Sequence, residues 1–389
     1  MHLNFMFQNE PRPGPLAMRN ARRFWTAYRR WFVAGGGAQS ADRVEAERAL
    51  RAHMPELAPI YDELVRTGPD DPLFARFLTL YRPPAFIGAC SMAVIGACGR
   101  PRLVRNYDFD PVLAEGVILR SAWRRQVLGT ADCLWGLVDG LNDHGLALAL
   151  TFGGRREVRD GFGIPLILRY VLETCRDVDD ATAALRAVPS HMAYNVTLLD
   201  RGGRFRTLHL HPGGGAEVLD RRFATNHQGR IHWPAQARFS ATLERARHLE
   251  RRIHATAAPR LDVGDFLEAP LYRTGYRAGF GTLYTAALDP AAGRTVYRWP
   301  DAELACDLAR LDPARIAIDY LDGQGARRGR EDAGWAGEPA DVFEIALRSI
   351  LDGLEAAGRP VTGAQLARLR GMPPTTSWAH IGDLFRSRP

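Results

Sequence analysis

The order of helix-like and strand-like segments is the feature that most constrains how this chain can fold. Ahead of residue 84 the sequence predicts mainly helices, and strand signals are few. After residue 84, strand-like runs come in hairpin pairs, then helices follow, and then further pairs of strands. Strands joined by tight turns pair antiparallel, whereas a regular strand–helix alternation would give a parallel sheet. The pattern therefore predicts an α+β fold with antiparallel sheets and helices layered outside them.

The expected segments divide the chain as follows. Helices are predicted over residues 16–33, 41–65, 73–81, 166–175, 179–188, 239–256 and 341–354, with a flexible break at residues 35–40. Strands are predicted over residues 87–97, 103–107, 116–123, 134–138, 146–152, 194–199, 205–211, 216–219, 223–225, 282–288 and 294–299. A helical extension from about residue 335 is expected to end the chain.

Composition excludes several classes of function. With 51 basic and 44 acidic residues among 389, the net charge is +7, but arginines alternate with acidic residues and no nucleic-acid-binding motif occurs. Five cysteines without a CxxC spacing argue against disulfides and structural zinc, and favour a reducing, cytoplasmic location. No run of about 20 apolar residues is present to span a bilayer. The aromatic and basic segment 16–33 is expected to pack on the protein, with binding to a membrane surface as the alternative.

A cysteine at the start of a predicted strand is the first candidate for chemistry. Cys90 follows two small residues, Gly88 and Ala89, and Arg105 and Asp108 come one hairpin later. A thiol needs a cation or a base nearby to react at neutral pH, and Arg105 could lower its pKa. Residues 105 and 108 fall on opposite strand faces, so a bend near Asp108 would be needed to aim both at one sulfur. Taken alone, a buried cysteine beside a surface ion pair explains the same spacing.

Further motifs, in a fixed order, resemble one known family. They are YRPP (81–84), GACS (88–91), LVRNYD (103–108), WGLVDGLNDHGL (135–146), IPLILRYVLE (164–173), MAYNVTLLD (192–200), ATNH (224–227) and GTLYT (281–285). This set, over about residues 45–300, resembles the acyl-coenzyme A:6-aminopenicillanic acid acyltransferase family. That family is isopenicillin-N acyltransferase-like and related to the choloylglycine hydrolases, which are also N-terminal-nucleophile hydrolases.

The resemblance implies a fold and a set of roles. The fold would be a four-layer αββα sandwich. Cys90 resembles the nucleophile, Asp108 the aspartate beside it, Arg105 the arginine of the choloylglycine branch, Asn195 the oxyanion donor, and Arg245 a late arginine near the nucleophile. At Thr151, Phe152 and Gly153 the chain departs from the choloylglycine pattern, which has an asparagine there.

The same resemblance implies self-cleavage between Ala89 and Cys90. Residues 1–89 would be a helical prosegment and residues 90–389 the catalytic domain. The freed α-amine of Cys90 would serve as the base, and the enzyme would hydrolyse or transfer the acyl group of a small N-acylated substrate, with acyl-CoA or an amine as a further partner. A homo-oligomer is compatible with this reading, and no cofactor or metal is required. The alternative is a non-enzymatic protein that binds a small acylated ligand with its chain intact.

Histidines give weaker signals. His227 follows Asn226 in one of the motifs and could line the site or make structural hydrogen bonds. His209, His211 and His232 could in principle bind a metal, but no cysteine or carboxylate shares their spacing, so a solvated strand face is the preferred interpretation.

Overall fold

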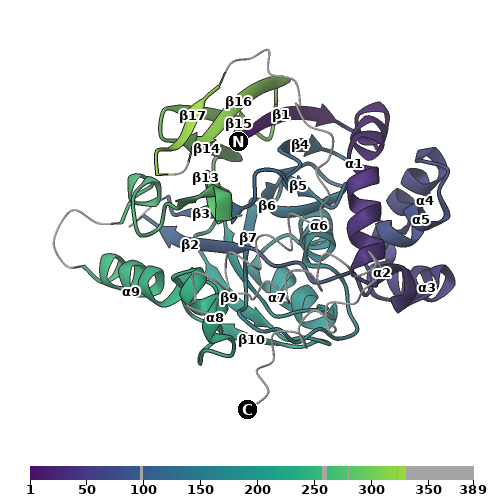
Figure 1. Ribbon diagram of the computed structural model, residues 1–389, viewed down its shortest axis with the longest axis horizontal. Helices are drawn as coiled ribbons and strands as arrows, with labels where there is room; N and C mark the ends of the chain where they lie inside the picture. The colour runs from purple at the N-terminus through teal and green to yellow at the C-terminus, as the bar shows by residue number, and fades with distance from the viewer. Residues whose placement is uncertain (97–99, 256–260, 279, 322, 330–389) are drawn as a thin grey trace, which may run out of the picture.

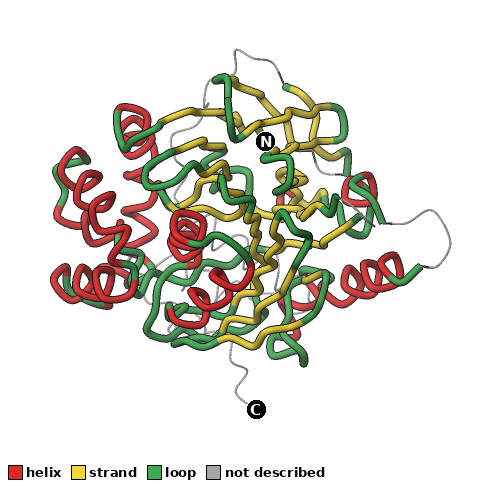
Figure 2. Tube along the Cα trace, turned by 180° about the vertical axis from the view of Figure 1, so that it is seen from behind, coloured by secondary structure: helices red, strands yellow, loops and turns green. Residues whose placement is uncertain are grey.

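The computed structural model describes residues 1–96, 100–255, 261–278, 280–321 and 323–329. Two sheets face one another in this part of the chain, and helices cover the outer side of each (Figures 1 and 2). The predicted α+β fold, with its four αββα layers, is thereby confirmed. The expected helix at 341–354 and the extension from about 335 lie outside the described residues.

The larger sheet has ten strands in the order β10-β9-β8-β7-β6-β5-β4-β1-β16-β17. Their bounds are β1 (His2–Glu10), β4 (Val117–Ser121), β5 (Val127–Asp132), β6 (Gly136–Asn142), β7 (Leu146–Phe152), β8 (Tyr194–Asp200), β9 (Phe205–Leu210), β10 (Ala216–Leu219), β16 (Ala314–Leu321) and β17 (Gly325–Arg328). All its neighbouring strands pair antiparallel except β1 and β4, which pair parallel.

The second sheet has the order β11-β2-β3-β13-β14-β15, and the short β12 also pairs with β13. Its strands are β2 (Ala89–Ile95), β3 (Arg102–Phe109), β11 (Phe223–Ala224), β12 (Thr274–Gly275), β13 (Phe280–Asp289), β14 (Arg294–Trp299) and β15 (Ala302–Asp307). Aromatic side chains fill the space between the sheets: Phe5 of β1 packs on Tyr284 and Trp299, with ring centroids 5.9 and 4.9 Å apart. Such burial of large rings is the main stabilising contribution available to a sandwich of this kind.

Helices form the outer layers. They are α1 (Pro15–Ala34), α2 (Gly37–Ser40), α3 (Arg43–His53), α4 (Ala58–Thr67), α5 (Pro72–Leu78), α6 (Ile164–Thr174), α7 (Val178–Ala187), α8 (Pro234–Phe239) and α9 (Thr242–Ile253), with 3-10 turns at Pro55–Leu57, Gly264–Leu267 and Tyr276–Ala278. Helices α6 and α7 pack on the ten-stranded sheet, and α9 packs on β2 and β11. Helices α1 to α5 gather at one side of the molecule (Figure 1).

Local sequence explains several helix starts. The side chain of Asp42 accepts a hydrogen bond from the Glu45 amide at the start of α3, and Asp177 does the same for two amides of α7. These side-chain caps satisfy N–H groups that have no partner within the helix. The aromatic stripe of α1 faces inward, because Trp25 packs on Phe74 and Phe77 and is 6% exposed. The interpretation of α1 as a helix packed on the protein is therefore confirmed.

The structure corrects three expectations about secondary structure, two in residues 1–89 and one near residue 240. Residues 1–89 are not purely helical, since β1 lies inside the larger sheet with Leu3, Phe5 and Phe7 buried. Residues 37–40 form a short helix instead of a break. The helix expected from residue 239 begins only at Thr242, as α9, because Ala241 adopts a left-handed φ of 48°, and the separate short helix α8 precedes it. Strands β5, β15, β16 and β17 were not expected.

Candidate active site

Cys90 lies in β2, directly opposite Tyr107 of β3, and is fully buried. Arg105 is two residues from Tyr107, so its side chain emerges on the same face of the sheet as the cysteine. Its Nη2 lies 3.0 Å from Cys90 Sγ. The predicted approach of Arg105 to the thiol is thus present in the structure.

Arg105 is held from the opposite sheet. Its Nη1 donates to the carbonyl of Val138 at 2.7 Å and to Oδ2 of Asp139 at 3.0 Å, both in β6. Tyr284 also donates to Asp139, at 2.7 Å, and Arg105 stacks on the ring of Tyr107. Asp139 therefore fixes the direction in which the guanidinium fork points. Sequence reasoning quoted Asp139 within the motif at 135–146 but gave it no role, since no local signal links a residue of β6 to the hairpin 89–109.

Asp108 approaches the cysteine from the other face of the sheet. It pairs with Ala89 in the ladder and contacts Thr282 Oγ1 at 2.7 Å and Arg245 Nη1 at 3.1 Å. Strand β3 keeps its register with β2, and the irregularity lies in β13, between Thr282 and Tyr284. The expected bend near Asp108 is absent: Arg105 reaches the sulfur on the inner face, whereas Asp108 faces helix α9.

Asn226 is the residue that links Asp108 and Arg245 to the backbone of Cys90. Its Oδ1 accepts the Cys90 amide N–H at 3.1 Å and a hydrogen bond from Arg245 Nη2 at 2.5 Å. Arg245 thus bridges Asn226 and Asp108, as its predicted place near the nucleophile requires. Asn226 was quoted as part of a motif but was not assigned a role, and its position directly after a short strand was the available signal.

Asn195 occupies a neighbouring position. Its Nδ2 donates to Thr151 Oγ1 at 3.0 Å and to the carbonyls of Thr225 and His227 at 2.8 and 3.2 Å. These contacts brace the two residues on either side of Asn226 and already use the amide hydrogens of Asn195. The role of Asn195 as an oxyanion donor stays a prediction, and Asn226 is the asparagine that touches Cys90.

Burial controls the ionisation of these groups. Burial raises the pKa of the Cys90 thiol, and this outweighs the opposing effect of Arg105. Burial also raises the pKa of Asp108, against Arg245 and then Arg273, which lower it. Burial lowers the pKa of Arg245 to about 10, still above neutrality. In the intact chain Arg105 lowers the pKa of the thiol, as expected, but burial raises it by more, so the net shift is upward.

The segment leading to Cys90 is itself buried. Phe86 packs on Phe109 with ring centroids 5.9 Å apart, and its carbonyl accepts the Tyr194 hydroxyl at 2.7 Å. Gly88 and Ala89 are also buried. The bond between Ala89 and Cys90 is thus enclosed, with its nitrogen on Asn226 and the sulfur beside Arg105.

The histidines are placed away from this chemistry. His227 contacts Thr242 Oγ1 at 2.9 Å, and burial followed by Arg221 lowers its pKa to about 4. His209 contacts Glu217 at 3.4 Å. Within the described ranges, no group of three His, Cys, Asp or Glu residues could hold a metal ion. Cys90, Cys133, Cys175 and Cys306 are free thiols, as predicted, and Cys98 lies outside the described residues.

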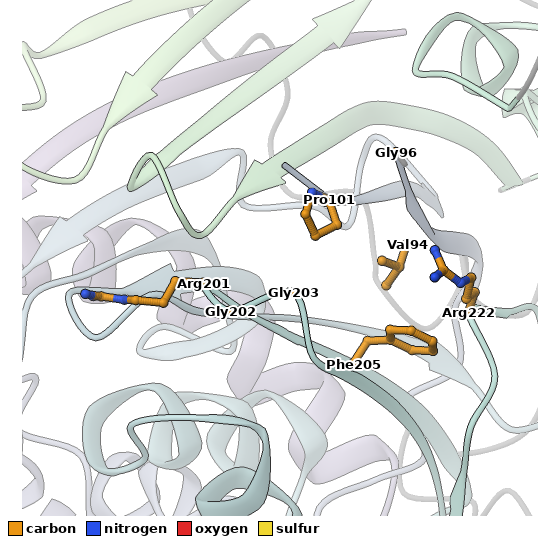
Figure 3. Close-up of a pocket in the computed structure, with 8 residues that line it drawn as sticks. All are labelled: Val94, Gly96, Pro101, Arg201, Gly202, Gly203, Phe205 and Arg222. Carbon is orange, nitrogen blue, oxygen red and sulfur yellow. The ribbon is translucent and has the colours of Figure 1, made fainter. Parts of the chain in front are cut away.

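A cavity of about 220 Å³ opens at the far end of β2 (Figure 3). It is lined by Val94, Gly96, Pro101, Arg201, Gly202, Gly203, Phe205 and Arg222. None of the predicted site residues lines it, so it is separate from the surroundings of Cys90. Among the described helices, none has the length and apolar character needed to cross a membrane.

The arrangement can now be compared with known proteins. A family model, "Acyl-coenzyme A:6-aminopenicillanic acid acyl-transferase", matches residues 97–303, which is more than half of the chain. The chain belongs to this family, as its motifs indicated. Membership implies an amide hydrolase or an acyltransferase. The match covers Asp108, Asn226 and Arg245 but begins after Cys90. Curated protein sequences give no significant match.

Solved structures of three enzymes are similar. A mutant conjugated bile acid hydrolase from Clostridium perfringens is 13% identical, with a TM-score of 0.41, over 63% of this chain and 97% of that one. Penicillin V acylase from Agrobacterium tumefaciens is 12% identical, with a TM-score of 0.39, over 60% and 92%. An N-acylethanolamine-hydrolyzing acid amidase ortholog from Caenorhabditis elegans is 14% identical, with a TM-score of 0.36, over 52% and 93%.

Proposed function

We propose that this protein is an amide hydrolase or acyltransferase that cuts its own chain between Ala89 and Cys90 and then uses Cys90 as an N-terminal nucleophile. One observation carries the proposal. The sulfur of Cys90 lies against Arg105, while its amide nitrogen lies against Asn226, which Arg245 joins to Asp108. Both atoms that such a nucleophile needs are therefore held before any bond is cut.

Maturation would run in two steps. Cys90 Sγ attacks the Ala89 carbonyl, the thiol proton passes to the amide nitrogen, and the C–N bond breaks, leaving a thioester and a free α-amine. Water then adds to the thioester, the C–S bond breaks, and residue 89 leaves as a carboxylic acid with the thiol restored. Arg105 would stabilise the charge on sulfur, because a guanidinium in a water-excluded site interacts strongly with an anion.

Turnover would reuse the same groups. The α-amine, whose reference pKa is about 8, accepts the thiol proton as sulfur attacks the substrate amide, and returns it to the leaving amine. Asn226 and Asp108 would orient the amine, and Asp139 would position Arg105. Asn226 Nδ2 donates one hydrogen bond to the Phe152 carbonyl at 3.4 Å, and its second hydrogen would serve the oxyanion. Water or a second amine then resolves the acyl-enzyme, giving hydrolysis or acyl transfer. Before cleavage, the chain that ends at Ala89 is the acyl group attached to Cys90. The path of this chain past Phe86 would therefore mark where the acyl part of a substrate binds.

The experiment is an intact-mass measurement with sequencing of the new terminus. Wild-type protein is expected as two chains, the larger one beginning Cys-Ser-Met-Ala-Val, while Cys90→Ala stays whole and inactive. Cys90→Ser should cut slowly and turn over poorly, because a hydroxyl has a far higher pKa than a thiol. Cys175→Ser is the matched control, a buried cysteine at the end of α6, and should cut normally.

Turnover is measured with 4-nitroanilides of acetic, hexanoic, decanoic and phenylacetic acids. The two chains should elute together in native size-exclusion chromatography, since β1 lies between β4 and β16. A whole, inactive wild-type chain would favour the alternative, a protein that only binds an acylated ligand. A whole but active chain would refute the N-terminal-nucleophile mechanism.

A further inference from the structure

The hydroxyl of Tyr194 binds the chain that leads to Cys90, and the mechanism above gives it no role. Tyr194 is the first residue of β8, and its hydroxyl donates a hydrogen bond to the carbonyl of Phe86 at 2.7 Å. The tyrosine is fully buried. Before cleavage the chain through Phe86 belongs to the acyl group on Cys90. This hydroxyl therefore binds the acyl half of the first amide that the proposed site would cut.

The direction of this hydroxyl does not depend on Phe86. The ring of Tyr194 packs on Phe152 and on His191, with ring centroids 6.1 and 5.9 Å apart. The backbone carbonyl of Tyr194 accepts a hydrogen bond from Gln228 Nε2 at 3.1 Å. All of these residues lie in the proposed catalytic part, so cleavage would leave them in place. A donor whose ring and backbone are both fixed is a preorganised binding group.

Cleavage would leave this hydroxyl without an acceptor. Burial raises the pKa of Tyr194 well above its ordinary value of 10, so the hydroxyl keeps its hydrogen near neutral pH. A substrate acyl group can reach Cys90 only when the residues next to the cut have moved aside. The Tyr194 hydroxyl then loses the Phe86 carbonyl, and a buried donor without an acceptor is unfavourable. An acyl group that brings an acceptor to the same point would restore the hydrogen bond.

The rest of this path is mostly apolar. The ring of Phe86 packs on Phe109 with centroids 5.9 Å apart, and Phe109 stacks on Tyr107 at 5.6 Å. Ile87 packs on the same hydrophobic core. These surroundings suit a hydrocarbon chain, and the Tyr194 hydroxyl adds a hydrogen-bond donor at one point along it. Apolar walls with a few placed polar groups are typical of sites that bind small molecules.

The covalent structure of the chain gives the position of that donor along an acyl group. Phe86 is three residues before Ala89, and each residue adds three bonds to the backbone. The carbonyl carbon of Phe86 is therefore nine bonds from the carbonyl carbon of Ala89, which the sulfur would attack. An acyl chain that follows the same path brings its tenth carbon to the Tyr194 hydroxyl.

We infer that the Tyr194 hydroxyl binds the acyl half of the substrate, where it donates to an oxygen about ten atoms along the chain from the scissile carbonyl. The enzyme would then prefer long, mostly apolar acyl groups with a carbonyl at that point to isomers that carry the carbonyl elsewhere. An oxygenated fatty acyl chain and a peptide-like acyl chain both present such a carbonyl. This inference rests on the proposed function and adds the kind of acyl group that the cleaved amide would contain.

The test compares two isomers, the 4-nitroanilides of 10-oxoundecanoic acid and of 7-oxoundecanoic acid, which differ only in the position of the ketone. Matured wild type should turn over the 10-oxo isomer with a kcat/KM about 10-fold higher, the gain expected from one buried hydrogen bond. Tyr194→Phe removes only the hydroxyl and should bring the ratio near one. Tyr320→Phe is the matched control and should keep the wild-type ratio, since the buried Tyr320 hydroxyl also donates to a carbonyl, that of Leu283, at 2.7 Å.

A third substrate identifies the source of the acceptor. In acetyl-Ile-Gly-Ala 4-nitroanilide the acetyl carbonyl takes the place of the Phe86 carbonyl. Faster turnover of this peptide than of the 10-oxo isomer would indicate a peptide-like acyl group, and slower turnover would indicate an oxygenated fatty acyl chain. In both cases Tyr194→Phe should lower kcat/KM for the preferred substrate more than for the 7-oxo isomer.

The isomer ratio is measured within each variant, so a change in the amount of matured enzyme cancels. Equal turnover of the two isomers by wild type would overturn the inference while leaving the proposed function standing, and this result does not require any variant to be cut. A Tyr194→Phe enzyme that keeps the wild-type ratio would also overturn it. A protein that is neither cut nor active on any amide would remove the proposed function and this inference together.

Discussion

Two buried groups of carboxylates in this molecule differ in what neutralises them. In the paired cluster (Arg105, Asp108, Asp139, Arg245), each acid has an arginine at 3.0 or 3.1 Å. In the acid cluster (Tyr28, Tyr107, Glu115, Asp132), the Tyr28 hydroxyl lies 2.6 Å from Glu115 and 2.8 Å from Asp132, and Tyr107 contacts Asp132 at 2.9 Å. No salt bridge to either acid is found among the described residues.

The difference shows how the same fold uses buried charge in two ways. Arginines let the carboxylates of the paired cluster balance charge around Cys90, and they fix directions as well. Without a cation, burial followed by the charge of Asp132 raises the pKa of Glu115 to about 8, so that Glu115 holds a proton at neutral pH. The acid cluster also joins Tyr28 of α1 to Tyr107, which neighbours Arg105. It therefore connects the proposed prosegment to the strand that carries the site.

Breaking the paired cluster should have the largest effect. In a Cys90→Ala background, where the chain stays whole, Arg105→Met should lower the free energy of unfolding by about 3–5 kcal/mol, because it leaves Asp139 buried without its cation. Arg105→Lys should lose less, since it keeps the charge but not the fork. Urea unfolding followed by circular dichroism measures both. A loss below about 1 kcal/mol for Arg105→Met would mean that the two clusters do not differ in this way.

Changing the acid cluster should alter the pH dependence of stability. The folded-state pKa of Glu115 is above its ordinary value of 4.5, so its contribution is fully present below about pH 4.5 and is lost as the pH rises through about 8. Relative to Glu115→Gln, the wild-type free energy of unfolding should fall by up to about 1.4 kcal/mol per pH unit across this window.

Urea unfolding of both proteins from pH 5 to pH 8.5, again in the Cys90→Ala background, checks this. Glu63→Gln, at a partly exposed site on α4, is the control and should follow wild type. Parallel curves for wild type and Glu115→Gln would show that Glu115 is ionised throughout.

An exposed ion pair is expected to contribute least to the free energy of unfolding. Arg43 and Glu47, one turn apart on α3, lie 2.6 Å from each other, and the arginine side chain is 52% exposed. Water and salt screen such a pair, so Arg43→Ala should cost about 0.3–0.5 kcal/mol in the same urea assay. A cost as large as that of Arg105→Met would show that burial does not govern these differences.

The sequence was a good guide to local structure and a weaker one to long-range placement. Caps, turns and alternation predicted most helices and hairpins, and the hairpin at 89–109 brought Cys90 and Arg105 together as expected. The alternation of Leu3, Phe5 and Phe7 was a strand signal for β1, but nothing local says that this strand pairs with residues 314–319. The sequence also does not show which asparagine contacts the nucleophile. Asn195 and Asn226 are adjacent in space, and only the fold shows that Asn226 reaches Cys90.

The position of β1 has a consequence for the life of the protein after synthesis. This strand is synthesised before the other described elements, yet one of its neighbours, β16, is among the last described segments to be made. The pairing of β1 with β16 therefore cannot form until late in translation. It requires a contact of very long sequence separation, and such contacts form slowly. If the Ala89–Cys90 bond is cut as proposed, the pairing of β1 with β16 would join two separate chains. Unfolding then becomes dissociation, and recovery of the native state depends on protein concentration. The protein would fold efficiently after synthesis, as a single chain, and would refold poorly if it were unfolded after cleavage.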